Sequence, residues 1–232
     1  MATVSYHLGI FLGFLIGLKM KFSIQRKQLK ALSRFSATKD IRYYLCGIHV
    51  VQNARGTYLE STNGHILGRL LIDETPVDGE NSVIIPNDAL KTLFGTAKQG
   101  NETLHFTVDG IKITVIQPDN STMQFSALDG SFPHCDRVLP SKLDDADIKP
   151  STYNPDYVMA FFDCASDLSG IKKPTGVSVS IMQRGNDSGI VALDCTELFV
   201  GIIMPMRDNS LSPSIPAWCK KPTVKALETE TA

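Results

Sequence analysis

The sequence predicts an α+β protein, and two observations carry that prediction. Strand-like and helix-like patterns of apolar residues follow one another in the order β-α-β-β-β, and this block of about 55–65 residues occurs three times. The composition is that of a folded chain, because 43% of the 232 residues are hydrophobic and 20% are charged. A chain of this length has room for one or two domains.

The first block begins with a strand at residues 21–25. A helix follows at residues 26–35, because Leu29, Leu32 and Phe35 recur at helical spacing among basic residues. Three strands are expected next, at residues 43–52, 57–61 and 66–72. The Asn63-Gly64 pair predicts a tight turn before the last of them.

The second block repeats this order. A strand at residues 82–85 leads through Pro86 into a helix at residues 87–96, since proline is favoured where a helix begins. Three strands are expected after it, at residues 103–108, 112–117 and 121–127.

The third block starts with a possible strand at residues 147–153. Asn154-Pro155 opens a helix that runs to about residue 168. The strands expected after it span residues 177–183, 189–195 and 199–204.

The two ends of the chain differ in composition from the three blocks. Residues 8–18 form an apolar run that is too short for a membrane-spanning helix, which needs about 20 residues. Residues 1–19 are therefore interpreted as a leader, with three alternatives open: a mistaken start upstream of Met20, a peripheral anchor, or a true signal or anchor. Residues 208–232 are rich in Pro and Ser, then polar, and are expected to form a tail.

The charge is unevenly distributed, although the net charge is only −1. Residues 20–98 hold eleven Lys or Arg against seven Asp or Glu, whereas residues 99–232 hold eleven against seventeen. This asymmetry favours a polyanionic partner for the first part of the chain.

No chemistry-bearing motif is found. The five cysteines are widely spaced and include no C-x-x-C pair, so neither a disulfide framework nor a metal site is expected. Hydrolase, metalloprotease and nucleotide-binding motifs do not occur. We therefore expect no cofactor and no catalytic residue, hence a protein that is not an enzyme, located in the cytoplasm with no membrane partner.

Five short segments carry a more specific resemblance. They read DIRYYLCG (40–47), STNGHIL (61–67), SVIIP (82–86), DGSFPHCDRVLP (129–140) and IIMPMR (202–207). In this order they resemble the bacterial DNA polymerase III beta subunit family, the processivity sliding clamps. The first four are similar to that family's middle domain and the last to its C-terminal signature.

The resemblance implies a DNA-clamp fold, with antiparallel sheets outside and helices on one face. A family member has three domains of two units each, whereas this chain has three units. Residues 20–140 would form one clamp domain, residues 141–149 a linker, and residues 150–207 half a domain. The chain thus resembles a shortened clamp, made of the middle domain and the C-terminal half of the last one.

The resemblance also implies a hydrophobic pocket that binds short linear motifs of DNA polymerases and clamp-loader subunits. Methionine side chains and an apolar floor suit such a pocket. Its residues here would be Leu45, Thr62, Gly64, His65, Ile66, Leu67, Pro140, Ile202, Met204, Pro205, Met206 and Arg207. Ile66 departs from the family, which commonly has an arginine there.

A second implied site is a set of cations that contact duplex DNA without reading its sequence. The candidates are Arg26, Lys27, Lys30, Arg34, Lys91, Lys98, Lys172 and Lys173. The acidic third helix, with Asp156, Asp163 and Asp167, argues against a uniformly basic DNA-facing surface.

The resemblance therefore predicts a homo-oligomeric processivity factor in DNA replication, which tethers a polymerase to double-stranded DNA. Two alternatives stay open. One is a non-ring decoy or regulator that binds clamp-motif peptides without encircling DNA. The other, less supported, is an enzyme on a clamp-like scaffold. The number of copies in the assembly is not fixed by the sequence.

Overall fold

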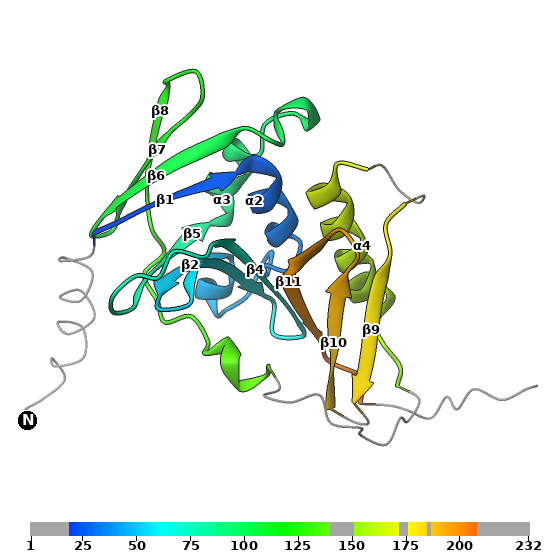
Figure 1. Cartoon of the computed structure of the whole chain (residues 1–232). Coiled ribbons are helices and arrows are strands. Elements are labelled where there is room, and N and C mark those ends of the chain that lie inside the picture. Colours follow the sequence, from blue (N-terminus) through cyan, green and yellow to red (C-terminus); the bar gives the residue numbers. More distant parts are fainter. Residues whose placement is uncertain (1–18, 140–150, 172–175, 185–186, 208–232) are drawn as a thin grey trace, which may run out of the picture.

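The computed structural model describes residues 19–139, 151–171, 176–184 and 187–207, which fold into mixed α and β structure (Figure 1). The first unit comprises β1 (Lys19–Gln25), α2 (Arg26–Ser33), β2 (Gly47–Asn53), β3 (Gly56–Thr62) and β4 (Ile66–Asp73). The second comprises β5 (Asn81–Pro86), α3 (Asn87–Leu93), β6 (Thr103–Asp109), β7 (Lys112–Ile116) and β8 (Thr122–Ser126). The third comprises α4 (Pro155–Ser169), β9 (Val179–Arg184), β10 (Asp187–Leu193) and β11 (Thr196–Ile203).

The expected α+β pattern is confirmed, with shifts of up to three residues at the ends of elements and two larger differences. Residues Tyr43–Leu45 form a 3₁₀ turn, η1, instead of the start of a strand. The carboxylate of Asp40 accepts a hydrogen bond from the backbone N–H of Arg42 at the start of the turn, and Leu45 at its end is buried. Residues 151–153 are not a strand, and the rest of the strand expected at 147–153 lies outside the described residues.

The strands form two antiparallel sheets whose first strands are exchanged between units. β1 joins the second unit in the order β1-β6-β7-β8, whereas β5 joins the first unit in the order β5-β2-β3-β4. The third unit extends the latter sheet, because β11 pairs antiparallel with β4, and the full order becomes β5-β2-β3-β4-β11-β10-β9. This seam between β4 and β11 joins the first and third units through backbone hydrogen bonds.

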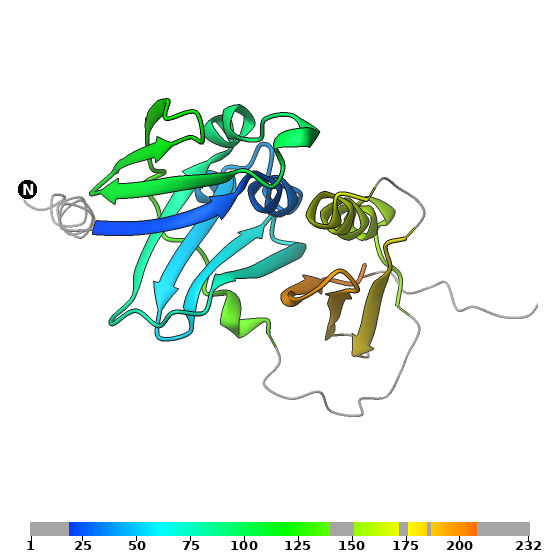
Figure 2. The same ribbon diagram turned by 45° about the horizontal axis from the view of Figure 1, so that its top comes forward.

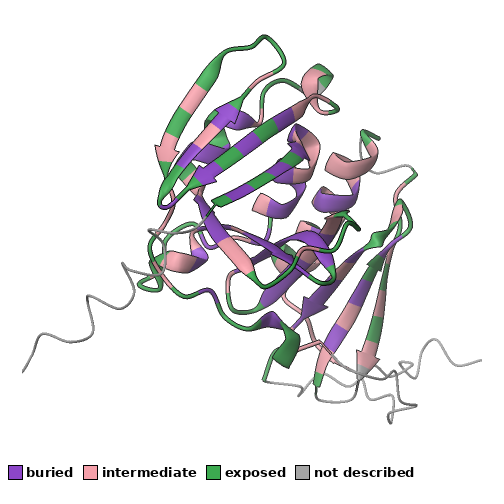
Figure 3. Ribbon diagram, turned by 60° about the vertical axis from the view of Figure 1, so that its left-hand side comes forward, coloured by how far each residue is buried: buried purple, intermediate pink, exposed green. Residues whose placement is uncertain are grey.

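The helices cover one face of the seven-stranded sheet, with α2 in contact with both α3 and α4 (Figure 2). The main core lies on this face and includes Leu29, Leu32, Phe35, Phe161 and Phe199. Along β1 and β6, buried and exposed residues alternate as expected for strands with one covered face (Figure 3).

A second apolar cluster is separate from the main core. It contains Ala37, Leu45, Leu67, Ile84, Phe132, Cys135 and Ile202. Ile66 and Leu70 belong to the main core, whereas Leu67 between them belongs to the second cluster, so the two clusters lie on opposite faces of β4.

Four of the five cysteines, Cys46, Cys135, Cys164 and Cys195, are described and form no disulfide. Cys135 and Cys164 are buried, and burial raises the pKa of the Cys135 thiol to about 12. In the part of the chain that the structure describes, no helix is both long and apolar enough to span a bilayer.

Candidate peptide-binding groove at the seam

The turn between β3 and β4 is held by its own side chains. The Thr62 hydroxyl donates to the carbonyl oxygen of Ile66 at 2.6 Å and accepts from the N–H of Gly64 at 3.0 Å. Gly64 has a φ of 90°, which favours glycine. The Asn63 side chain accepts from the N–H of His65. These bonds fix the backbone of His65 at the edge of the seam.

The end of β11 is attached to this turn and to the segment before α4. The N–H of Met204 donates to the carbonyl oxygen of His65 at 2.9 Å, and the N–H of Met206 donates to that of Thr152 at 2.7 Å. Pro205 stands between them and cannot donate. Residues 204–207 therefore leave the sheet between two fixed backbone points.

A groove of about 980 Å³ lies at this place. That volume is in the range of ligand-binding clefts. The lining residues are Gly64, His65, Arg137, Val138, Leu139, Asn154, Tyr157, Asp187, Ser188, Met204, Pro205, Met206 and Arg207.

The structure brings half of the predicted pocket residues to the groove surface, namely Gly64, His65, Met204, Pro205, Met206 and Arg207. Leu45, Leu67 and Ile202 are buried in the second apolar cluster, which also contacts Met204, Val138 and Leu139 and so forms a floor beneath the groove. Thr62 is buried in the turn, whereas Ile66 is buried in the main core on the opposite face of β4 and does not line the groove. Pro140 lies outside the described residues.

Sequence reasoning missed the residues that come from other segments, which are Arg137, Val138, Leu139, Asn154, Tyr157, Asp187 and Ser188. Tyr157 of α4 stacks on His65, with ring centroids 5.4 Å apart and an interplanar angle of 15°. Asn154 caps α4 by accepting from the N–H of Asp156. The cap was visible in the sequence, but its place in the lining of the groove depends on tertiary packing.

The groove combines apolar side chains with charges at its rim. Met204, Met206, Val138 and Leu139 supply adaptable or aliphatic surface, and Met206 is 48% exposed. Arg137 and Arg207 are exposed cations, with Asp187 as an exposed carboxylate. This arrangement fits an apolar peptide with polar ends better than a small charged metabolite.

Arg26 corrects part of the predicted DNA-contact set. It is only 4% exposed, and its guanidinium donates to the carbonyl oxygen of Leu93, to Glu102 and to Gln117. The charge is satisfied inside the protein, so Arg26 cannot offer it to a phosphate. Its sequence position among basic helix residues gave no sign of this burial.

Two further predicted cations face α4. Lys30 pairs with Asp167 at 2.8 Å, and Arg34 pairs with Asp167 at 2.8 Å and with Asp163 at 3.6 Å. These ion pairs hold α2 against α4, and Asp167 is largely buried by them.

The other predicted cations differ in exposure. Lys27 is half-buried, whereas Lys91 and Lys98 are exposed, and Lys91 has an exposed partner in Asp88 at 3.1 Å. An exposed pair of this kind contributes little stability and leaves the lysine accessible. Lys172 and Lys173 lie outside the described residues. Within the described ranges, no three His, Cys, Asp or Glu side chains group as metal ligands.

Comparison with known proteins finds bacterial sliding clamps. No family model matches the chain. The beta sliding clamp of Pseudomonas aeruginosa is 29% identical over 128 residues, which cover 52% of this chain and 34% of that protein. A crystal structure of the Pseudomonas aeruginosa DNA polymerase sliding clamp with ligand matches with a TM-score of 0.64 at 18% identity, over 81% of this chain and 66% of that one.

A second crystal structure, the DNA polymerase III subunit beta from Pseudomonas aeruginosa, matches with a TM-score of 0.60 at 19% identity, over 89% of this chain and 69% of that one. The chain thus spans about a third of the curated relative and about two thirds of the solved clamps. It resembles the bacterial beta sliding clamps in sequence, and it has the DNA-clamp fold.

Proposed function

We propose that the chain is a sliding-clamp-like processivity factor, which tethers a DNA polymerase to duplex DNA. The observation that supports this most is the groove at the β4–β11 seam, where Met204–Arg207 meet the His65 turn over an apolar floor. Polymerase and clamp-loader subunits would insert short linear motifs there. Such a tether needs no catalytic residue, because it acts by raising the local concentration of the polymerase on DNA.

Duplex DNA would be contacted through its phosphates, independently of sequence. Of the cations predicted for this role, Lys27, Lys91 and Lys98 are described, are not buried and are not paired with α4. The protein would work in the cytoplasm as a homo-oligomer. Strands β8 and β9 end their sheets, and no strand of the described residues pairs with their outer edges, so further copies could attach there.

The test combines native mass with retention on DNA. Light scattering gives the number of copies in solution. Labelled protein is then loaded on nicked circular DNA, and its retention is measured before and after the DNA is linearised. A processivity clamp forms a closed oligomer that stays on the circle and slides off the linear form. A protein that is retained equally on both forms, or on neither, would contradict a sliding clamp.

A second candidate is a non-ring regulator that binds clamp-motif peptides and does not encircle DNA. The ion pairs between α2 and α4 favour it, since Lys30 and Arg34 are engaged by Asp163 and Asp167 instead of being free for phosphates. A monomer that binds a short labelled peptide with Leu and Phe anchors, but not DNA at low salt, would identify this candidate.

A further inference from the structure

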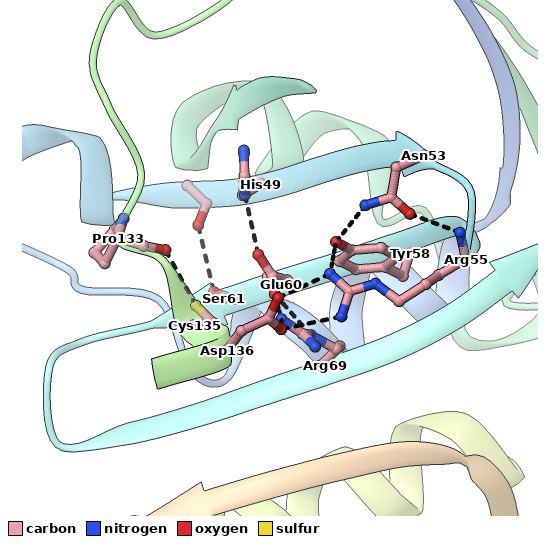
Figure 4. Close-up of polar contacts among 11 residues, drawn as sticks. His49, Asn53, Arg55, Tyr58, Glu60, Ser61, Arg69, Pro133, Cys135 and Asp136 are labelled. Carbon is pink, nitrogen blue, oxygen red and sulfur yellow. Dashed lines mark hydrogen bonds and ion pairs between the residues drawn. The ribbon is translucent and has the colours of Figure 1, made fainter. Parts of the chain in front are cut away.

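A row of polar side chains crosses the outer face of the seven-stranded sheet (Figure 4). His49 of β2, Glu60 of β3 and Arg69 of β4 are direct cross-strand neighbours. His49 Nδ1 lies 3.1 Å from Glu60 Oε2, and Arg69 Nε donates to Glu60 Oε1 at 2.7 Å. Glu60 is 3% exposed, so a buried carboxylate here is compensated by two partners.

Asp136 closes the end of this row from a distant segment of the chain. Its carboxylate lies 2.7 Å from Arg69 Nη2 and accepts from Arg55 Nη1 and Nη2 at 3.2 and 2.9 Å (Figure 4). Both guanidiniums also lie over the ring of Tyr58, at 5.4 Å for Arg55 and 4.9 Å for Arg69. Such paired, bidentate contacts fix direction as well as distance.

The segment that carries Asp136 continues directly into the groove. Asp136 is the middle residue of the 3₁₀ turn η3 (Cys135–Arg137), and Arg137, Val138 and Leu139 line the groove. On one side of Asp136, the Cys135 side chain is buried in the apolar floor.

Side chains attach this turn to the sheet. The backbone hydrogen bonds of η3, from Arg137 to His134 and from Val138 to Cys135, stay within the turn. Phe132 stacks on His49, with ring centroids 4.5 Å apart, and Asp136 pairs with the arginines. Phe132 thus contacts His49 of the polar row, and Asp136 contacts Arg69 of the row and Arg55 beside it.

We propose that Asp136, held by Arg55 and Arg69, is a positioning residue that sets the Arg137–Leu139 wall of the groove for peptide binding. The proposal rests on the proposed peptide-binding function of the groove. Asp136 does not line the groove, so it would act through the residues that follow it.

The experiment measures affinity for a short labelled peptide with Leu and Phe anchors by fluorescence anisotropy. Asp136→Asn keeps the size of the side chain but removes the charge, and we expect about a fivefold weaker affinity, the scale of one exposed ion pair. Asp136→Glu should recover most of it. Asp129→Asn, which removes an exposed carboxylate earlier in the same segment, is the matched control and should bind like the wild type.

Amide hydrogen exchange of residues 132–139 gives a readout that does not depend on the peptide. Exchange should become faster in Asp136→Asn while the melting temperature changes little, because Asp136 is exposed. A double-mutant cycle with Arg55→Ala should show that removing the Arg55 side chain raises the exchange rate more when Asp136 is present than in Asp136→Asn, although the contacts of Arg55 with Tyr58 remain in both.

The outcomes separate the two proposals. A wild-type protein that binds no such peptide contradicts the function of the groove, and exchange unchanged in Asp136→Asn then contradicts the positioning role as well. A wild-type protein that binds the peptide, with Asp136→Asn binding equally well, overturns the positioning role and leaves the groove function standing.

Discussion

Gly68 of β4 and Gly201 of β11 lie directly opposite each other across the seam, and an aromatic ring occupies the space beside each. A Cβ on Gly68 would lie 2.5 Å from the ring of Phe35, and a Cβ on Gly201 would collide with the ring of Phe161. The ring centroids of Phe35 and Phe161 are 4.9 Å apart. Glycine at both positions therefore leaves room for Phe35 of the first unit and Phe161 of the third unit to pack against the sheet at the seam.

Replacing Gly201 by alanine should destabilise the protein, because the added methyl group must displace Phe161. Overpacking of this kind costs about 1–3 kcal/mol, and chemical denaturation measures it. Combining Gly201→Ala with Phe161→Leu should cost less than the sum of the two single changes, since the smaller side chain leaves room. Additive effects would mean that the ring and the glycine are not coupled.

The groove predicts a binding defect without a folding defect. Met206 is 48% exposed and lines the groove, so Met206→Ala should weaken binding of a Leu- and Phe-anchored peptide by about fivefold. Its free energy of unfolding should change by less than about 0.5 kcal/mol. Met182→Ala, at a methionine that is 49% exposed on β9 and not in the groove, is the matched control.

Equal affinities of Met206→Ala and Met182→Ala would remove Met206 from the binding surface. Met204 is less suitable for this comparison. It packs on the apolar cluster beneath the groove, so its truncation would also change stability.

The exposed lysines Lys91 and Lys98 predict a salt-dependent affinity for DNA. Lys91→Gln combined with Lys98→Gln should weaken association with duplex DNA and lower the slope of log affinity against log salt by about 2, because each lysine that binds a phosphate contributes about 1. Lys112→Gln, at an exposed lysine on β7, should leave the slope unchanged. The same slope in all three proteins would mean that this surface does not face DNA.

The ion pairs of the acidic helix α4 predict that a substitution there strengthens DNA binding. Asp167→Asn removes the carboxylate that pairs with Lys30 and Arg34, so it should strengthen binding to DNA at low salt. It should also lower stability slightly, because α2 and α4 are then no longer joined by these ion pairs. Unchanged DNA affinity with lowered stability would assign these pairs a purely structural role.

The regular elements were predictable because each follows from a local pattern of apolar residues. The strands at residues 57–61 and 66–72, for example, agree closely with β3 (Gly56–Thr62) and β4 (Ile66–Asp73). The exchange of β1 and β5 between units was not predictable, since a strand's pattern gives its buried face and not its partner.

Groove residues were predictable where a contiguous motif carries them, as Gly64 and His65 lie in one motif and Met204–Arg207 in another. Residues 204–207 were identified from a contiguous motif, whereas Tyr157 reaches the groove through a stack with His65 that depends on tertiary packing. Arg26 shows the converse error. Its place in a basic helix suggested exposure, but Glu102, Gln117 and the carbonyl of Leu93 together make its burial possible.

The Asp136 carboxylate should make the free energy of unfolding decrease in acid. Asp136→Asn should remove this pH dependence. Hydrogen bonds from Arg55 and then Arg69 lower the pKa of Asp136 from 3.8 to about 2. Because the folded pKa is depressed, the stabilisation is complete above the unfolded value of 3.8 and is lost as the pH falls through the folded value of about 2. Wild type and Asp136→Asn should therefore differ in unfolding free energy at neutral pH and converge in acid.

Urea denaturation from about pH 7 to about pH 1.5 measures this difference. Solvent screening keeps it small, since both Asp136 and Arg55 are more than half exposed. Asp129→Asn, at an exposed carboxylate, is the control and should change the free energy of unfolding at neutral pH by less than about 0.5 kcal/mol. A difference between wild type and Asp136→Asn that stays constant into acid would show that the arginines stabilise the neutral side chain equally well, and that the ion pair is not what holds η3 to the sheet.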